Sequence, residues 1–137
     1  ITQMLGQLGE QGGSLVMDNN LRGCPVSAED GARVLSALLD QLSTGIQVYG
    51  IYHYCSSDSA TYYEFAEALL ASASQFSDFG PGAVQLQRQP EGLLPLNRSL
   101  NCNKIRNTFA IKQAHWRSAI PGNVKKYYEQ RRQQQKQ

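Results

Sequence analysis

The most regular hydrophobic pattern in the chain covers residues 62–73. Apolar side chains recur there at the spacing of one helical face, at Tyr62, Phe65, Ala66, Leu69, Leu70 and Ala73. Thr61 and Glu64 have the spacing of a capping box, in which the two side chains satisfy free backbone N–H groups at the start of a helix. The sequence therefore predicts an amphipathic helix that begins directly after Thr61.

A run of β-forming residues precedes this helix. Residues 50–55 are rich in tyrosine and isoleucine and carry no acidic or basic side chain apart from His53. Such a run, bounded by the polar residues 56–61, predicts a buried strand followed by a turn. His53 could act as a proton donor, but a histidine within a buried strand is more often a hydrogen-bonded core residue, and we expect the core role.

A second helix is predicted after Ser27. Ser27 is a suitable N-cap residue, Glu29 and Asp30 follow in the first turn, and residues 43–45 should end the helix. The expected apolar face consists of Ala28, Ala32, Leu35, Leu38, Leu39 and Leu42.

The remaining pattern alternates short strands with helices. We expect the end of a helix within residues 1–12, strands at 15–17 and 84–87, and extended chain at 21–26 and 96–102. A short helix is expected at 103–109. A last helix should start at 113, be interrupted by Pro121 and Gly122, and resume at 124–130. This order predicts an α/β fold with three main helices and a few short strands. The strands are too few for a complete doubly wound sheet.

Composition and charge divide the chain into a body and a tail. The hydrophobic content of 41% and charged content of 18% are those of an ordinary globular protein. No run approaches the roughly 18 apolar residues of a membrane span, no signal peptide is recognisable, and we expect a cytoplasmic protein. Residues 125–137 carry a net charge of +4, against +2 for the whole chain. We therefore predict a body at 1–124 and a basic, glutamine-rich tail at 125–137 that is a solvated helix end rather than a nucleic-acid arm.

The three cysteines suggest neither a disulfide framework nor a zinc site. Cys24, Cys55 and Cys102 are odd in number and widely spaced, without a Cys-x-x-Cys pair. We expect reduced, partly buried thiols. Arg22 lies close to Cys24 in sequence and could lower the pKa of that thiol, although a packed, inert thiol is the simpler interpretation.

One glycine motif has the spacing of a dinucleotide-binding loop, but the elements predicted on either side of it do not fit such a loop. Gly6, Gly9 and Gly12 have the Gly-x-x-Gly-x-x-Gly spacing of a dinucleotide loop. That loop must follow a buried strand and precede a helix N-terminus. Here residues 2–5 are not a buried strand and residues 13–17 are predicted to form a strand instead of a helix. We assign this chain no cofactor-binding residue.

Three blocks of sequence resemble one known family. The first block has a strand, a Gly-x-Pro turn and a helix, which are matched here by Asp18, Gly23, Pro25, Asp30 and Ala32. The second has Gly-x-Tyr-His and Glu-Phe-Ala elements, which are matched by Gly50, Tyr52, His53 and residues 64–66. The third ends in Lys-Leu and is matched by residues 94–105, with Lys104 and Ile105 in the last two positions. Trp116 stands where the family opens its last helix. In order and spacing, these blocks resemble the C-terminal part of extended short-chain dehydrogenases, closest to the dTDP-4-dehydrorhamnose reductase, or RmlD-like, family.

The sequence also departs from the family pattern. Leu94 replaces an arginine and Asn101 an aspartate, so a bidentate anion contact is lost; Arg98 is a candidate to compensate. The Tyr-x-x-x-Lys pair that the family uses for proton transfer does not occur. The resemblance thus implies NAD or NADP in a larger parent protein, bound by residues absent here, and an inactive chain when it stands alone.

Candidate ligand contacts are few. Arg22, Pro25 and Asn97 are our choices for lining a substrate cleft, with a plain surface or turn role as the alternative for each. We assign no catalytic and no metal-ligating residue.

The resemblance implies the substrate-side portion of an NAD(P)-dependent reductase that acts on a nucleotide-linked 4-keto sugar. A non-catalytic regulatory or binding subunit on the same scaffold is the alternative, and a basic-tailed nucleic-acid binder a remoter one. The chain lacks an initiator methionine, so we expect a fragment whose missing N-terminal Rossmann domain would pack against residues 50–55. Without that domain, the exposed apolar surface predicts self-association, such as a homo-oligomer.

Overall fold

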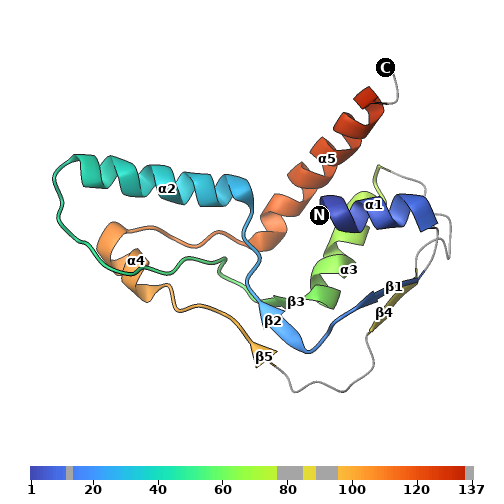
Figure 1. Cartoon of the computed structure of the whole chain (residues 1–137), viewed down its shortest axis with the longest axis horizontal. Coiled ribbons are helices and arrows are strands. Elements are labelled where there is room, and N and C mark those ends of the chain that lie inside the picture. The colour runs from blue at the N-terminus through green and yellow to red at the C-terminus, as the bar shows by residue number, and fades with distance from the viewer. Residues whose placement is uncertain (12–13, 77–84, 89–95, 135–137) are drawn as a thin grey trace.

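A computed structural model describes residues 1–11, 14–76, 85–88 and 96–134 of the chain (Figure 1). In chain order, its elements are α1 (Thr2–Gln11), β1 (Ser14–Met17), β2 (Leu21–Gly23), α2 (Ala28–Ser43), β3 (Ala60–Thr61), α3 (Tyr62–Ala73), β4 (Gln85–Arg88), β5 (Leu96–Asn97), α4 (Asn103–Phe109) and α5 (Trp116–Gln134). The α/β class is confirmed, with α2, α3 and α5 as the longest helices and only short strands.

The strands form two small sheets. β1 and β4 pair in parallel, with Val16 opposite Gln87. In the second sheet β2 is central, antiparallel to β3 and parallel to β5, so that Arg22 lies opposite both Thr61 and Asn97. The pairing of β2 with β5 brings together chain segments about 75 residues apart in sequence.

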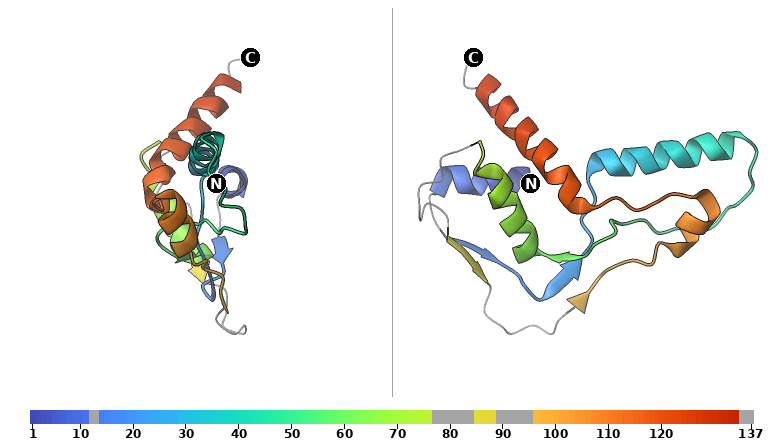
Figure 2. Two further views of the ribbon diagram at one scale, coloured as in Figure 1. Left: turned by 90° about the vertical axis from the view of Figure 1, so that its left-hand side faces the viewer. Right: turned by 180° about the vertical axis from the view of Figure 1, so that it is seen from behind.

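The molecule has two lobes, each with its own hydrophobic cluster. α1, α3 and α5 surround one cluster, while α2, α4 and the segment before β3 surround the other (Figure 1). Seen edge-on, the arrangement is flat (the left view of Figure 2). β2 and the residues after it connect the lobes, and this connection is where the candidate site lies.

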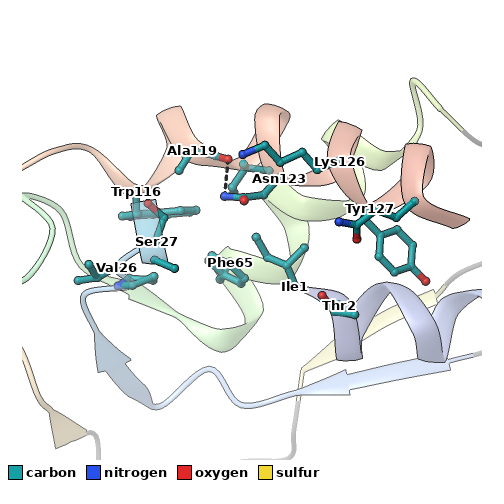
Figure 3. A pocket seen from close by; sticks show the side chains of 14 residues that line it. Ile1, Thr2, Val26, Ser27, Phe65, Trp116, Ala119, Asn123, Lys126 and Tyr127 are labelled. Carbon is teal, nitrogen blue, oxygen red and sulfur yellow. Dashed lines mark hydrogen bonds between the residues drawn. The ribbon is translucent and has the colours of Figure 1, made fainter. Parts of the chain in front are cut away.

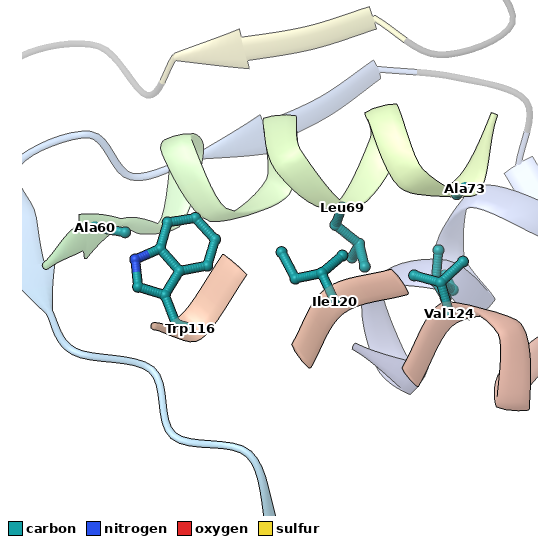
Figure 4. Packing of buried hydrophobic residues seen from close by; sticks show 7 residues of the cluster. Ala60, Leu69, Ala73, Trp116, Ile120 and Val124 are labelled. Carbon is teal, nitrogen blue, oxygen red and sulfur yellow. The ribbon is translucent and has the colours of Figure 1, made fainter. Parts of the chain in front are cut away.

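α3 is formed as its sequence predicts. The Thr61 hydroxyl accepts a hydrogen bond of 3.1 Å from the Glu64 N–H, and the Thr61 N–H donates one of 3.0 Å to the Glu64 carboxylate. This capping box satisfies two N–H groups at the start of the helix. The buried face of α3 and the adjoining Ala60 of β3 pack against α5 through the following residues (Figure 4): Ala60, Leu69, Ala73, Trp116, Ile120 and Val124.

The prediction that Pro121 and Gly122 interrupt the last helix is wrong. The helix runs unbroken from Trp116 to Gln134. Pro121 removes one backbone hydrogen bond, but Ile120 and Val124 on either side are buried against α3, and this packing maintains the helical path. The expected boundary after residue 124 falls inside α5, and the division into body and tail stays a prediction. Trp116 is buried, as expected for an anchor of the last helix.

The predicted strand at residues 50–55 is the clearest error. The segment is extended but pairs with no strand among the described residues. Tyr52, Tyr54 and Cys55 face the second cluster, and the Tyr52 ring packs on Phe109 with a 5.1 Å centroid separation. Ile51 is 78% exposed and His53 is also exposed, so His53 is not the core residue that we expected.

α2 is capped as predicted but packed differently. The Ser27 hydroxyl accepts a hydrogen bond of 3.1 Å from the Asp30 N–H. Val34, outside the predicted apolar face, is the buried residue of the helix, whereas Leu35 and Leu39 are 63% and 67% exposed. Exposed apolar side chains continue beyond the helix, and we call the whole set the 35–51 apolar surface: Leu35, Leu39, Leu42, Ile46, Tyr49 and Ile51.

Candidate functional site

A cavity of about 390 Å³ lies beside β2, and we call it the β2 cavity. β2 and the chain after it supply one wall, the start of α3 a second, and α1 a third. Its lining includes two of the predicted site residues, Arg22 and Pro25, together with Met4, Leu21, Tyr62, Phe65 and Arg98. The lining is mainly apolar, with two guanidinium groups and no carboxylate among its described residues. Such a surface suits a ligand that has both an apolar part and an anionic part.

Arg22 is held by the protein itself. Its guanidinium donates hydrogen bonds to the Ser59 carbonyl oxygen at 3.2 Å, to the Ser59 hydroxyl at 3.1 Å and to the Glu64 carboxylate at 2.5 Å. Glu64 is also the capping-box residue of α3. Arg22 therefore joins β2 to the start of α3 and shapes the cavity wall.

Arg98 approaches the same cavity from the chain that follows β5. Its backbone N–H donates a hydrogen bond of 2.9 Å to the Arg22 carbonyl oxygen. Its side chain is exposed and lines the cavity. Unlike Arg22, its guanidinium has no hydrogen bond or ion pair with any residue in the described part of the chain. The motif comparison singled out Arg98 only as a substitute for a lost arginine.

Asn97 lies beside Arg22 in the sheet, but its side-chain amide bonds the following turn. The side-chain oxygen accepts a hydrogen bond of 2.9 Å from the Ser99 N–H and shapes the turn after β5. Asn97 is exposed and is not part of the cavity lining. A direct ligand contact by this side chain stays a prediction.

A second cavity, of about 420 Å³, continues from the first along α5, and we call it the α5 cavity (Figure 3). The two share Ile1, Pro25 and Phe65 in their linings. Phe65 and Trp116 form an aromatic pair on its floor, with ring centroids 5.5 Å apart. Polar side chains of α5 border its other side in Figure 3: Asn123, Lys126 and Tyr127.

Sequence reasoning missed the polar side of the α5 cavity. Ala119, Asn123, Lys126 and Tyr127 recur at helical spacing, and this pattern could have identified one face of a helix. The expected break at Pro121 hid it, because the pattern is continuous only when the helix passes through that residue. Lys126 also forms an ion pair with Glu29 of α2 at the edge of this cavity.

The three thiols, separated in sequence, come together behind the β2 cavity. The Cys55 and Cys102 sulfur atoms are 3.6 Å apart, and both residues are buried. Cys24 lines the cavity and lies close enough to Cys55 for the two thiols to affect each other's pKa. Burial raises the pKa of the Cys24 thiol and that of the Cys55 thiol. The hypothesis that Arg22 lowers the pKa of Cys24 is therefore wrong, since Arg22 is directed to Glu64 and burial dominates.

The described residues contain no group of three or more histidine, cysteine, aspartate or glutamate side chains that could hold a metal ion. Gly6 and Gly9 lie inside α1, which β1 follows, so this region lacks the strand, loop and helix order of a dinucleotide site. None of the helices in the described ranges has both the length and the hydropathy that a bilayer crossing requires.

Comparison with known proteins agrees with the motif blocks. The RmlD substrate binding domain family matches residues 1–129. A dTDP-4-dehydrorhamnose reductase of Aggregatibacter actinomycetemcomitans is 30% identical over 113 residues, which cover 78% of this chain and 38% of the relative. The chain therefore spans less than half the length of that relative.

Solved structures share the fold at low sequence identity. A dTDP-4-dehydrorhamnose reductase from Clostridium acetobutylicum superposes with a TM-score of 0.70 at 17% identity, covering 90% of this chain and 41% of its own. The Bacillus anthracis enzyme, solved in complex with NADP, gives 0.63 at 18% identity, with 87% and 39% covered. Since the family match extends over nearly the whole sequence, the expectation from the motifs is confirmed: the chain belongs to the RmlD substrate binding domain family.

Proposed function

We propose that this chain is the substrate-side portion of an NAD(P)-dependent reductase that acts on a nucleotide-linked 4-keto sugar. The observation that carries the proposal is the family match over residues 1–129, whose Gly-x-Pro motif, Gly23 to Pro25, lines the β2 cavity. The relative with 30% identity is a dTDP-4-dehydrorhamnose reductase. The cytoplasm, which keeps thiols such as Cys55 and Cys102 reduced, is the proposed compartment.

The role proposed for these residues is binding and orientation. The β2 cavity offers apolar surface at Met4, Pro25 and Phe65 and positive charge at Arg98. An aromatic ring at its rim, Tyr62, is 52% exposed and available for stacking. These groups suit a base or sugar next to a diphosphate. They do not transfer hydride or a proton, because the chain has no Tyr-x-x-x-Lys pair.

NADP is bound by the Bacillus anthracis relative, and in the protein to which this chain belongs we propose that such a cofactor is held mainly by residues outside this chain. Gly6 and Gly9, two of the three glycines with a suitable spacing, lie in α1, and Gly12 lies outside the described residues. We propose that a Rossmann-type portion supplies the cofactor and the catalytic pair. The 35–51 apolar surface is the proposed place where that portion packs, since Leu35, Leu39 and Leu42 are exposed along one face of α2 and a continuous exposed apolar face marks an interface.

Measurements of ligand binding and of turnover distinguish the substrate-side portion of a reductase from a non-catalytic subunit. We expect calorimetry to detect binding of a dTDP-linked 4-keto sugar to the chain, without consumption of NADPH. Turnover, followed by NADPH absorbance, should require a Rossmann-type portion that carries the Tyr-x-x-x-Lys pair. Failure of the chain to bind the sugar nucleotide, alone and with that portion, would overturn the proposal. Binding without turnover by the combined protein would support the alternative of a non-catalytic subunit.

A further inference from the structure

The two arginines of the β2 cavity differ in how much of their charge is free. Arg22 makes three hydrogen bonds, one of them to Glu64. The side chains of this ion pair are 39% and 34% exposed. A ligand anion that approached Arg22 would meet the Glu64 carboxylate beside it. Arg22 and Glu64 therefore largely compensate each other in the cavity wall.

Arg98 carries the positive charge that the described protein leaves uncompensated at this cavity. Its guanidinium has five N–H donors in a planar fork, and none of them is used by another described residue. Its backbone is nevertheless fixed. The Arg98 N–H is bonded to the Arg22 carbonyl oxygen at 2.9 Å, and the Leu96 N–H is bonded to the Asn20 carbonyl oxygen at 3.2 Å. A free charged group on a fixed backbone is the arrangement expected of a ligand contact.

We propose that Arg98 binds the diphosphate of the nucleotide-linked sugar, while Arg22 only holds the cavity wall in place. This inference rests on the proposed function for the identity of the ligand. A guanidinium can donate two parallel hydrogen bonds to phosphate oxygens, which makes such contacts stronger than neutral ones. The apolar lining of Met4, Pro25 and Phe65 would hold the uncharged remainder of the ligand. The predicted site residue Arg22 is thereby replaced by Arg98 as the anion contact.

The test compares charged and uncharged ligands on one pair of variants. Calorimetry of the full chain with dTDP, thymidine and inorganic pyrophosphate is run on the wild type, Arg98→Gln and Arg98→Lys. Arg106→Gln is the matched control, because Arg106 is exposed on α4, its guanidinium bonds Asn103 among the described residues, and it does not line the cavity. We expect Arg98→Gln to weaken dTDP binding by roughly tenfold or more and to leave thymidine binding unchanged. Arg98→Lys should recover part of the affinity, since it keeps the charge without the fork.

The outcomes separate this inference from the proposed function. If the wild type binds dTDP and Arg98→Gln binds it equally well, the role of Arg98 is overturned and the proposed function survives. If the wild type binds the dTDP-linked sugar neither alone nor with a Rossmann-type portion, but binds pyrophosphate in a way that Arg98→Gln abolishes, the anion site stands and the proposed function fails. Equal weakening by Arg98→Gln and Arg106→Gln would indicate only the loss of net charge, and would also overturn the inference.

Discussion

Glu64 accepts a 2.5 Å hydrogen bond from Arg22 with one carboxylate oxygen and a 3.0 Å hydrogen bond from the Thr61 N–H with the other. One side chain thus caps α3 and fixes β2 against it. Because β2 forms a wall of the β2 cavity, the shape of the candidate site depends on a contact made for local helix stability.

Replacing Glu64 should therefore cost more than replacing its partner. The side chains of Arg22 and Glu64 are 39% and 34% exposed, so solvent screening limits the ion pair to less than about 1 kcal/mol. Arg22→Ala also removes the two hydrogen bonds to Ser59, and we expect it to lower the free energy of unfolding by about 1 kcal/mol in total. Glu64→Ala also removes half of the capping box and should cost about 1–2 kcal/mol. Urea denaturation of both variants and the double variant measures their coupling. Equal effects of the two single changes would contradict the dual role.

Local signals account for most of what the sequence predicted correctly. The capping box at Thr61, the N-cap at Ser27 and the helical spacing after Thr61 depend on residues within one or two turns. The same holds for the short strand β1 and for α4. Arg22 and Pro25, which stand in or beside a recognisable motif block, line the β2 cavity, and their contact with a ligand stays a prediction.

Contacts between distant segments account for most of the errors. Residues 50–55 have the composition of a strand, but a strand also needs a partner, and composition cannot show that none is present among the described residues. The cluster of Cys24, Cys55 and Cys102 and the approach of Arg98 to Arg22 depend on the pairing of β2 with β5. Nothing in the residues between those strands specifies this pairing.

Two glycines should respond in opposite ways to alanine. Gly122 lies within α5, and a Cβ there would meet no atom within 4 Å. Gly122→Ala should stabilise the protein by about 0.5–1 kcal/mol, because alanine favours the helical backbone. Gly50 has a φ of +145°, and a Cβ there would lie 3.0 Å from the Lys104 amine, so Gly50→Ala should destabilise. Thermal unfolding monitored by circular dichroism measures both; a stabilising Gly50→Ala would contradict the observed backbone conformation.

The buried thiols should be slow to react and should make stability fall at alkaline pH. Burial raises the pKa of Cys55 and Cys24 in the folded protein. Above the ordinary thiol value of about 8.5, the unfolded chain loses these protons while the folded chain retains them. The free energy of unfolding must then decrease as pH rises through this range.

A pH series of urea denaturations tests this dependence. The variant Cys24→Ser/Cys55→Ser should show a flatter decline above about pH 8.5. Thiol labelling of the native wild type should be slower than labelling of the denatured chain at every pH. Rapid native labelling of Cys55 at neutral pH would contradict its burial.

The 35–51 apolar surface should cause the chain to self-associate when nothing covers it. Leu39 is 67% and Tyr49 83% exposed, and burying such side chains contributes roughly 25 cal/mol for each Å² removed from water. Leu39→Glu should therefore shift the chain towards a monomer in sedimentation velocity. Leu100→Glu is a matched control, since Leu100 is also exposed but lies outside this surface. If the wild type associates and both variants associate equally, another face is responsible. Addition of a Rossmann-type portion from an RmlD-like reductase should protect residues 35–51 from hydrogen exchange, because we propose that it packs on this surface.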